Sequence, residues 1–299
     1  MDSFIEHVRR VPTRLGTLSV RRVGRGVPTV LWSSMFVDSH TWDRVLPLLL
    51  AGAPGREYVL IDPPGLGLSE PLRGRTTIGE AADAGRDALQ ALGIVGPVDW
   101  VGNAFGGHVG YELATDESAL RSLVAISAPT EPVPAPLRRK IALLHPILRL
   151  AGPIRPVEKA VVAAMLTDAA AEDTGILRVV LESLARPTRA GLSFALRSFI
   201  IDRRDVTDRL AGISVPSLFV ASDDRGDWSP EDAERSAAQA PHARALTIAR
   251  ARTLIPLEQP AALAEAIIAF WREVDDARDG GAGRSRAARP ASAPPLPAA

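Results

Sequence analysis

A pentapeptide in the middle of the chain has the spacing of a turn that presents a catalytic nucleophile. Gly102-Asn103-Ala104-Phe105-Gly106 follows a short apolar run and precedes a segment of helical character. In the motif G-x-S-x-G, a sharp strand-to-helix turn exposes the central side chain for attack on a substrate. We expect glycine at 102 and 106 because a Cβ atom at either position would collide with neighbouring backbone. Ala104 has no oxygen, sulfur or carboxylate, so it cannot attack a substrate.

Other residue types that support catalysis are absent or scattered. The chain has no cysteine, which excludes thiolate chemistry and cysteine-based metal sites. Its five histidines are widely spaced and show no metal-ligand pattern: His7, His40, His108, His145 and His242. We therefore expect no metal site and no cofactor.

Length and charge limit the class of protein. A chain of 299 residues can bury a full hydrophobic core, and α/β folds of roughly this length often form one domain. The formal net charge is +0 and the pI is about 7.0, so we expect neither nucleic acid nor a membrane as a partner. Residues 1–7 contain no apolar run typical of a signal peptide, and no stretch approaches the ~18 apolar residues of a membrane span. We expect a soluble, cytoplasmic protein.

Strand-like and helix-like segments alternate along most of the chain. Residues 7–24 alternate apolar and polar side chains around Gly16, as two antiparallel edge strands would. Further strands are expected at 27–32, 58–62, 97–102, 120–127, 217–221 and 243–249, and helices near 41–51, 77–92, 105–115, 230–240 and 260–275. This alternation predicts an α/β fold with a mostly parallel, doubly wound sheet of about eight strands.

The pattern changes after the strand at 120–127. Residues 128–212 contain only helix-like segments, which predicts a helical lid inserted between two strands. Residues 1–127 and 213–276 would then form the core of the fold. Residues 277–299 are rich in glycine, arginine, proline and alanine, and we expect them to form a disordered tail.

Five motifs in this order resemble those of the α/β-hydrolase superfamily. They are the apolar strand and loop at 30–38, Asp62-x-Pro64-Gly65-x-Gly67-x-Ser69, the turn at 102–106, Ala221-Ser222-Asp223-Asp224, and Leu254-Ile255-Pro256-Leu257-Glu258-Gln259-Pro260. The chain is most similar to the capped branch that contains esterases, epoxide hydrolases and haloalkane dehalogenases. The resemblance implies an α/β-hydrolase fold.

The resemblance also assigns catalytic positions, and two of the three have the wrong residue. The nucleophile position falls on Ala104 and the histidine position on Thr253. The acid position falls on Asp224, with Asp227 as the second choice because this loop is slightly long. A triad needs a nucleophile, a histidine that takes its proton and an acid that orients the histidine. Ser33-Ser34 also replaces the usual His-Gly at the start of the oxyanion loop.

The oxyanion hole does not need these side chains because backbone N–H groups form it. The resemblance assigns these groups to Phe105, at a helix N-terminus, and to Met35. We expect a pocket that binds a small apolar or carbonyl-containing molecule through Ser33, Ser34, Met35, Phe36 and Phe105.

Several polar residues near these positions could have either a structural or a functional role. Asp62 is expected to be structural, and Ser33 and Ser34 could simply replace the structural contacts of the usual histidine. A packed or solvent-bridged role is favoured for His108, and a lid-surface role for His145. Asp38 and His40 are slightly better candidates because they lie beside the oxyanion loop.

Three functional hypotheses follow. The first is a non-hydrolytic catalyst of the cyclase, isomerase or lyase type, acting in secondary metabolism. The second is an inactive, ligand-binding pseudoenzyme. The third is an ester or epoxide hydrolase whose nucleophile has been replaced. Loss of a triad nucleophile or histidine costs about 10⁶-fold in kcat, so covalent Ser-His-Asp hydrolysis is disfavoured.

Overall fold

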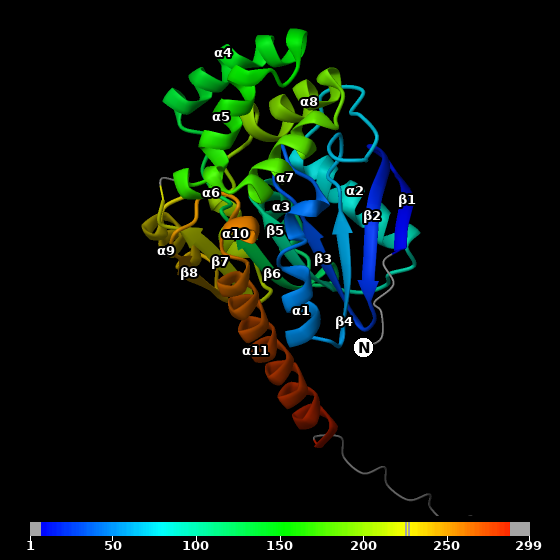
Figure 1. The fold of residues 1–299 in the computed structure, drawn as a ribbon. Coiled ribbons are helices and arrows are strands. Elements are labelled where there is room, and N and C mark those ends of the chain that lie inside the picture. Colours follow the sequence, from blue (N-terminus) through cyan, green and yellow to red (C-terminus); the bar gives the residue numbers. More distant parts are fainter. Residues whose placement is uncertain (1–6, 225, 227, 288–299) are drawn as a thin grey trace, which may run out of the picture.

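The sheet has the mixed order expected of an α/β fold with antiparallel edge strands (Figure 1). The computed structural model describes residues 7–224, 226 and 228–287. Over these residues the sheet has eight strands in the order β1-β2-β4-β3-β5-β6-β7-β8. β2 pairs antiparallel with β1 and β4, and all other neighbours are parallel. The strands are β1 (His7–Thr13), β2 (Gly16–Gly24), β3 (Val27–Trp32), β4 (Arg56–Ile61), β5 (Val98–Asn103), β6 (Leu120–Ile126), β7 (Ser217–Ser222) and β8 (Ala243–Ile248).

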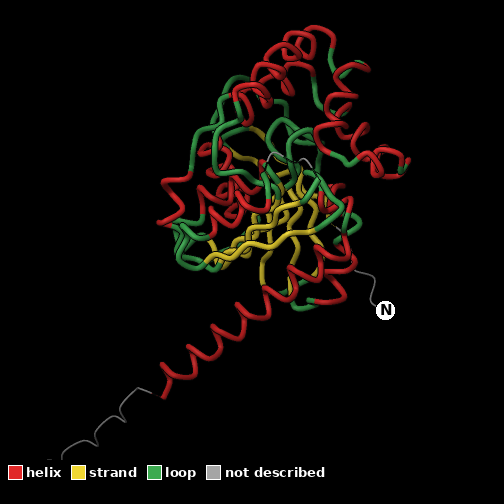
Figure 2. The backbone as a smooth tube through the Cα atoms, turned by 90° about the vertical axis from the view of Figure 1, so that its left-hand side faces the viewer, coloured by secondary structure: helices red, strands yellow, loops and turns green. Residues whose placement is uncertain are grey.

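Helices cover both faces of the sheet, as Figure 2 shows. The buried residues of α1 (Leu46–Gly52) and α11 (Pro260–Ala287) pack on one face. Those of α2 (Ile78–Ala91), α3 (Phe105–Leu113) and α9 (Pro230–Ala237) pack on the other. Neighbouring residues of a strand point to opposite faces, so the central strands must be apolar on both sides. The predicted α/β-hydrolase fold is therefore confirmed.

Helices alone fill the described chain between β6 and β7, and they form the lid at one end of the sheet (Figures 1 and 2). They are α4 (Ala135–Ala151), α5 (Arg155–Met165), α6 (Asp168–Glu172), α7 (Thr174–Ala185) and α8 (Arg189–Leu196), followed by the π-helical turn η2 (Arg197–Ile201) and the 3-10 helix η3 (Thr207–Gly212). In Figure 1, α4 lies furthest from the sheet. Another 3-10 helix, η1 (Ser39–Trp42), and the short α10 (Ile255–Glu258) belong to the core.

The last helix is longer than the sequence suggested. α11 continues to Ala287, whereas we expected helix only to 275 and a disordered tail from 277. Its first half is anchored because Leu263, Ile267 and Trp271 are buried against the sheet. Once a helix is nucleated, adding a residue costs little, so the anchored half can extend through a sequence that composition alone marks as disordered. The remainder of the expected tail, 288–299, lies outside the described residues.

Candidate functional site

The turn after β5 has the strained geometry that a nucleophile elbow requires. Ala104 joins β5 to α3 with φ 45° and ψ −102°, a conformation that costs a residue with a Cβ about 1–3 kcal/mol. A Cβ on Gly102 would lie 2.1 Å from the carbonyl carbon of Gly106, and one on Gly106 would lie 2.3 Å from the Trp32 oxygen. Both glycines are therefore required by close backbone approach, as expected from the sequence.

A cavity of about 540 Å³ lies between this turn and the lid. Its size is typical of small-molecule pockets. It brings together six of the residues assigned from the sequence: Ser34, Met35, Phe36, Ala104, Phe105 and Thr253. The lid supplies most of the remaining wall, through apolar residues that include Leu137, Ile141, Leu144, Leu148, Val157 and Val161. The site is thus an apolar chamber with the strained turn at its base.

Two backbone N–H groups beside the turn are available to a ligand. Those of Phe105 and Met35 have no acceptor among the described residues, and both residues line the cavity. Phe105 is the first residue of α3, where the helix dipole also favours negative charge. The arrangement can bind a carbonyl oxygen or an anion.

Ser33 lies outside the cavity, contrary to its assignment as a ligand-binding residue. It is fully buried, donates a hydrogen bond from Oγ to the Asp38 carbonyl (2.8 Å) and accepts one from Trp42 Nε1 (3.1 Å). These bonds close the loop that carries Met35. Ser33 therefore has the structural role that the sequence left open, and only Ser34 of the serine pair lines the cavity.

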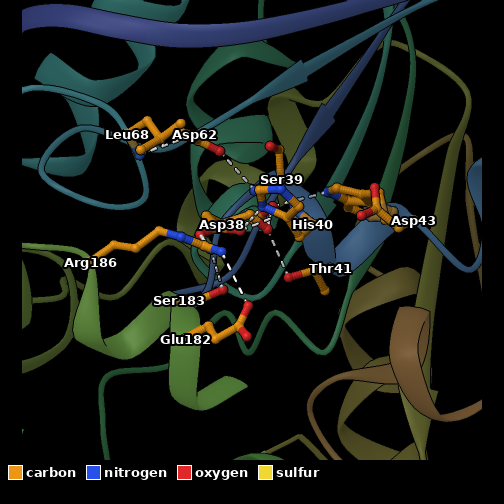
Figure 3. Close-up of polar contacts among 12 residues, drawn as sticks. Asp38, Ser39, His40, Thr41, Asp43, Asp62, Leu68, Glu182, Ser183 and Arg186 are labelled. Carbon is orange, nitrogen blue, oxygen red and sulfur yellow. Dashed lines mark hydrogen bonds and ion pairs between the residues drawn. The ribbon is translucent and has the colours of Figure 1, made fainter. Parts of the chain in front are cut away.

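A polar cluster around Asp38 joins this loop to the lid (Figure 3). The fully buried Asp38 carboxylate accepts hydrogen bonds from His40 Nδ1 (2.8 Å) and His40 N (3.1 Å), and it pairs with Arg186 at the end of α7. Burial opposes ionisation, but these hydrogen bonds and the charges of His40 and Arg186 outweigh it, so the pKa of Asp38 is lowered. The same hydrogen bond raises the pKa of His40.

Asp62 supports the same loop from the core, also in Figure 3. Its carboxylate accepts hydrogen bonds from Ser39 N (2.8 Å) and Leu68 N (2.9 Å). A Cβ on Gly67 would lie 2.6 Å from this carboxylate. Asp62 is structural, as expected, because it fastens two loops to each other.

Asp224 lies in the loop after β7, and its carboxylate forms an ion pair with an arginine. Arg252 Nη2 lies 3.1 Å from Asp224 Oδ2, and Arg252 Nε donates to the Asp224 carbonyl at 3.3 Å. The Arg252 side chain is only 5% exposed and also donates to the Ala163 carbonyl in the lid. Asp224 does not line the cavity, and Asp227 lies outside the described residues. Nothing in the sequence indicated this role for Arg252.

Thr253 lies at the edge of the cavity, with its polar groups directed to the lid. Its hydroxyl donates to the Ala164 carbonyl (3.3 Å) and its N–H to the Met165 carbonyl (3.2 Å). Asn103 Nδ2 in turn donates to the Thr253 carbonyl (2.8 Å), so it links the elbow to this loop. Asn103 was not assigned from the sequence, because nothing in the sequence indicates a partner 150 residues away.

His108 is packed, the role favoured from the sequence, and it also borders the cavity. It lines the cavity one helical turn after Ala104 and is 4% exposed. Its Nε2 lies 2.9 Å from the Pro129 carbonyl, which can only accept, so Nε2 carries the proton. Nδ1 is then a lone-pair acceptor, and it is buried without a partner among the described residues. Burial, together with the charge of Arg203, lowers the pKa of His108 well below its usual range.

The remaining candidates lie elsewhere. His145 contacts Ser193 Oγ at 2.9 Å within the lid and does not line the cavity. In the part of the chain that the structure describes, no three histidine or acidic side chains gather as a metal site would require. No described helix is both long and apolar enough to cross a membrane.

Comparisons with known proteins agree with the fold. A family model described as "Alpha/beta hydrolase family" matches residues 29–266. A thermophilic esterase from Thermogutta terrifontis is similar in structure, with a TM-score of 0.79, 20% identity, and coverage of 90% of this chain and 99% of that one. An enol-lactonase from Burkholderia xenovorans gives a TM-score of 0.79 at 18% identity, covering 88% and 100%. No curated protein matched the chain.

The family match covers most of the chain, so the chain belongs to the alpha/beta hydrolase family. The low identities to the esterase and the enol-lactonase mean that these likenesses show the fold alone.

Proposed function

We propose that this chain binds a small apolar or carbonyl-containing molecule beneath its lid and acts on it without a covalent intermediate. Cyclisation, isomerisation and elimination are reactions of this type. The observation that carries the proposal is the elbow itself: its strained geometry, cavity and backbone donors are present, but its central residue is alanine.

Hydrolysis by a triad has little support at this site. Ala104 provides no nucleophile and Thr253 no imidazole. An unperturbed threonine hydroxyl is far too weak a base at neutral pH. Without nucleophile and base, a hydrolase of this kind retains about 10³–10⁴-fold catalysis over water, from binding and the oxyanion hole. Residual acceleration of that kind comes from the N–H groups and the cavity, which are the features that this chain has.

His108 gives the cavity a group that can handle a proton. A carbonyl oxygen bound at the Phe105 N–H would lie about one helical turn from this residue, or about 5 Å along the helix axis. Because its pKa is well below the usual range, His108 is neutral and its Nδ1 is a weak base and a good hydrogen-bond acceptor. Because Nδ1 is buried, the His108 ring must turn toward the cavity before Nδ1 can orient a ligand hydroxyl or accept a proton next to the carbonyl.

Ligand binding without turnover is the second candidate. The ion pair between Arg252 and Asp224 favours this second candidate. Asp224 is at the position whose carboxylate orients an imidazole in the family, and here that carboxylate pairs with Arg252 instead. The two candidates share a binding site and differ only in whether the bound molecule changes.

A first experiment separates both candidates from hydrolysis. The purified protein is incubated with p-nitrophenyl butyrate and, separately, with a fluorophosphonate probe that labels active serines. We expect ester turnover near background and no labelling. Labelling, or turnover that is lost in Asp224→Ala, would overturn the proposal. The Ala104→Ser/Thr253→His variant measures how much hydrolysis the scaffold supports when both side chains are supplied.

A second experiment tests the cavity and His108. Small ketones, lactones and enones are screened by thermal shift against the protein, Ala160→Trp and Ala169→Trp. Ala160 lines the cavity and Ala169 is exposed on α6, so only Ala160→Trp should abolish ligand shifts. Ligands that bind are then examined by mass spectrometry for conversion. Conversion that disappears in His108→Gln supports catalysis, and unchanged ligand supports binding alone.

A further inference from the structure

The outer face of α4 is an exposed apolar stripe. Leu143 and Leu150 are each 75% exposed and Ile147 is 39% exposed. At 100° per residue, positions 143, 147 and 150 fall within about 60° of each other on the helix surface. Ile154, the N-cap residue of α5, is also exposed, at 41%. Large apolar side chains of soluble proteins are seldom gathered in this way without a binding role.

A different face of the same helix, about 120° around its axis from the stripe, lines the cavity. Leu137, Ile141, Leu144 and Leu148 contact the chamber, and Leu148 is only 1% exposed. α4 is thus apolar on two sides, one directed to the ligand site and one directed outward. α4 is also the part of the lid furthest from the sheet (Figure 1).

Positive charge is concentrated on this part of the lid, with Arg139 and Lys140 beside the stripe and the other cations around it on α4 and α5; Lys140 also borders the cavity. Between residues 135 and 159 there are six cationic side chains and one acidic one, Glu158. The cationic residues are all exposed, and none forms an ion pair with a described residue: Arg138, Arg139, Lys140, Arg149, Arg155 and Lys159. Arg139 and Lys140 lie one helical turn before Leu143, so they flank the stripe directly.

We infer that this face, the α4 stripe with its six cations, binds the surface of an anionic membrane. A helix with an apolar stripe bordered by arginine and lysine lies in the membrane interface, with its apolar side chains below the headgroups. Anionic lipids attract each nearby cation. The expectation from the sequence was no membrane partner, because the net charge of zero hides this local excess.

A second copy of the chain is a poorer occupant. The common symmetric dimer pairs a surface with itself, so the six cations of one copy would face the six of the other. Like charges directly opposed across an interface weaken it. An anionic lipid surface would bury the apolar stripe and attract the cations beside it at the same time.

The position of this face relative to the cavity indicates a route by which a ligand could enter. The bilayer would lie on one side of α4 and the cavity on another, so an apolar molecule dissolved in the membrane would reach the chamber by passing α4. The inference concerns where the protein binds, and it stands whether or not the bound molecule is converted.

Vesicle flotation with the full chain tests the inference. Vesicles of phosphatidylcholine alone are compared with vesicles containing equal parts of phosphatidylcholine and phosphatidylglycerol, at low and physiological ionic strength. We expect flotation with the anionic vesicles, weakened by salt, and little with the neutral ones. No flotation with anionic vesicles, or equal flotation with both, would overturn the inference.

Variants locate the surface. Leu143→Gln/Leu150→Gln should weaken vesicle binding at least about tenfold, because it removes two large apolar side chains from the lipid-facing stripe. Arg138→Gln/Arg139→Gln should weaken it about tenfold and reduce its salt dependence. The matched control is Val95→Gln/Leu246→Gln, which removes two exposed apolar side chains elsewhere. Circular dichroism checks that all variants fold.

Sedimentation velocity over a range of concentrations tests the other occupant. We expect a monomer that the leucine substitutions leave unchanged. A dimer that is lost in Leu143→Gln/Leu150→Gln would assign the stripe to a second copy and overturn the inference. Control substitutions that weaken vesicle binding as strongly as the α4 substitutions would also overturn it.

Discussion

The guanidinium of Arg252 lies 3.1 Å from the carboxylate of Asp224, and Arg252 directly precedes Thr253 in the chain. Arg252 therefore pairs with the side chain that the family resemblance assigns to the acid position. Replacing Thr253 alone by histidine would place an imidazole next to a carboxylate that already has a buried cation as its partner. The changes at these positions are linked by contact.

Removing the charge of Asp224 should destabilise the protein. In Asp224→Asn the buried Arg252 loses its nearest carboxylate and keeps the exposed Asp168 at 3.6 Å. We expect the free energy of unfolding to fall by about 1–3 kcal/mol, less than for a fully buried pair because Asp224 is 27% exposed. Urea denaturation measures this change in the free energy of unfolding. Asp223→Asn is the control, since the exposed Asp223 only accepts a bond from Arg250 N, and it should change stability by under about 0.5 kcal/mol. Equal effects would contradict the prediction.

The elbow should not tolerate a methyl group at Gly106. A Cβ there would lie 2.3 Å from the Trp32 oxygen, so Gly106→Ala must move β3 away from α3. We expect a loss of at least about 3 kcal/mol, or no folded protein. Gly74→Ala, where nothing lies within 4 Å of the added atom, should fold normally. A thermal melt of Gly106→Ala like that of the unsubstituted chain would refute this account.

Ala104→Gly should have the opposite effect. Glycine adopts φ 45° without the steric cost that alanine bears, although it loses more entropy on folding. The expected net change is a gain of about 0.5–2 kcal/mol in the free energy of unfolding. The same substitution at Ala169, in ordinary helical geometry on α6, should lose about 1 kcal/mol. Losses of similar size at both positions would show that the turn is not strained.

His40 should stabilise the protein more at low pH than at high pH. Its pKa is raised in the folded protein by the hydrogen bond to Asp38, so the protonated form favours folding. This contribution is fully present below the unfolded pKa of about 6.5 and is lost as the pH rises through the folded value. The stability difference between the protein and His40→Gln should therefore shrink as the pH rises above about 6.5. A difference that grows with pH would contradict the sign.

His108 should behave in the reverse sense. Its pKa is lowered by burial, so the unfolded chain binds the proton more readily than the folded one. Its stability contribution is present above the unfolded pKa of about 6.5 and is lost as the pH falls toward the folded value. In His108→Gln, the part of the acid-induced loss of stability that comes from protonation of His108 should be absent. Imidazole NMR offers a direct check, because the His108 signals should show no titration between about pH 6 and 8.

The fold and the position of the cavity follow from patterns that are local in the sequence. Short apolar runs separated by turns predict the strands, and loops that follow parallel strands meet at one edge of the sheet. This is why Met35, Ala104 and Thr253, far apart in the chain, could be expected at one site. The extent of α11 was wrong because composition does not reveal that the buried Trp271 anchors the helix.

The side-chain partners within the site could not be predicted in this way. Arg186 contacts Asp38 across 148 positions, and Asn103 contacts Thr253 across 150. Such pairs depend on how the lid and loops pack, which no local pattern records. The tautomer of His108 likewise depends on the Pro129 carbonyl, which lies in the loop after β6. The α4 stripe was hidden because an amphipathic pattern does not show which of two apolar sides faces solvent.

The backbone segments packed closely against Gly102 and Gly106 hold the turn in its shape. This shape should therefore persist when another small residue replaces Ala104. The chain contains no cysteine, so Ala104→Cys would introduce its only thiol, at the base of the cavity and next to two backbone donors. A fluorophore or spin label attached there would report whether the chamber is filled, and its rate of attachment would measure how often the lid admits a reagent. An alanine at the base of the cavity thus makes it possible to turn the chain into a single-site sensor of its own ligand.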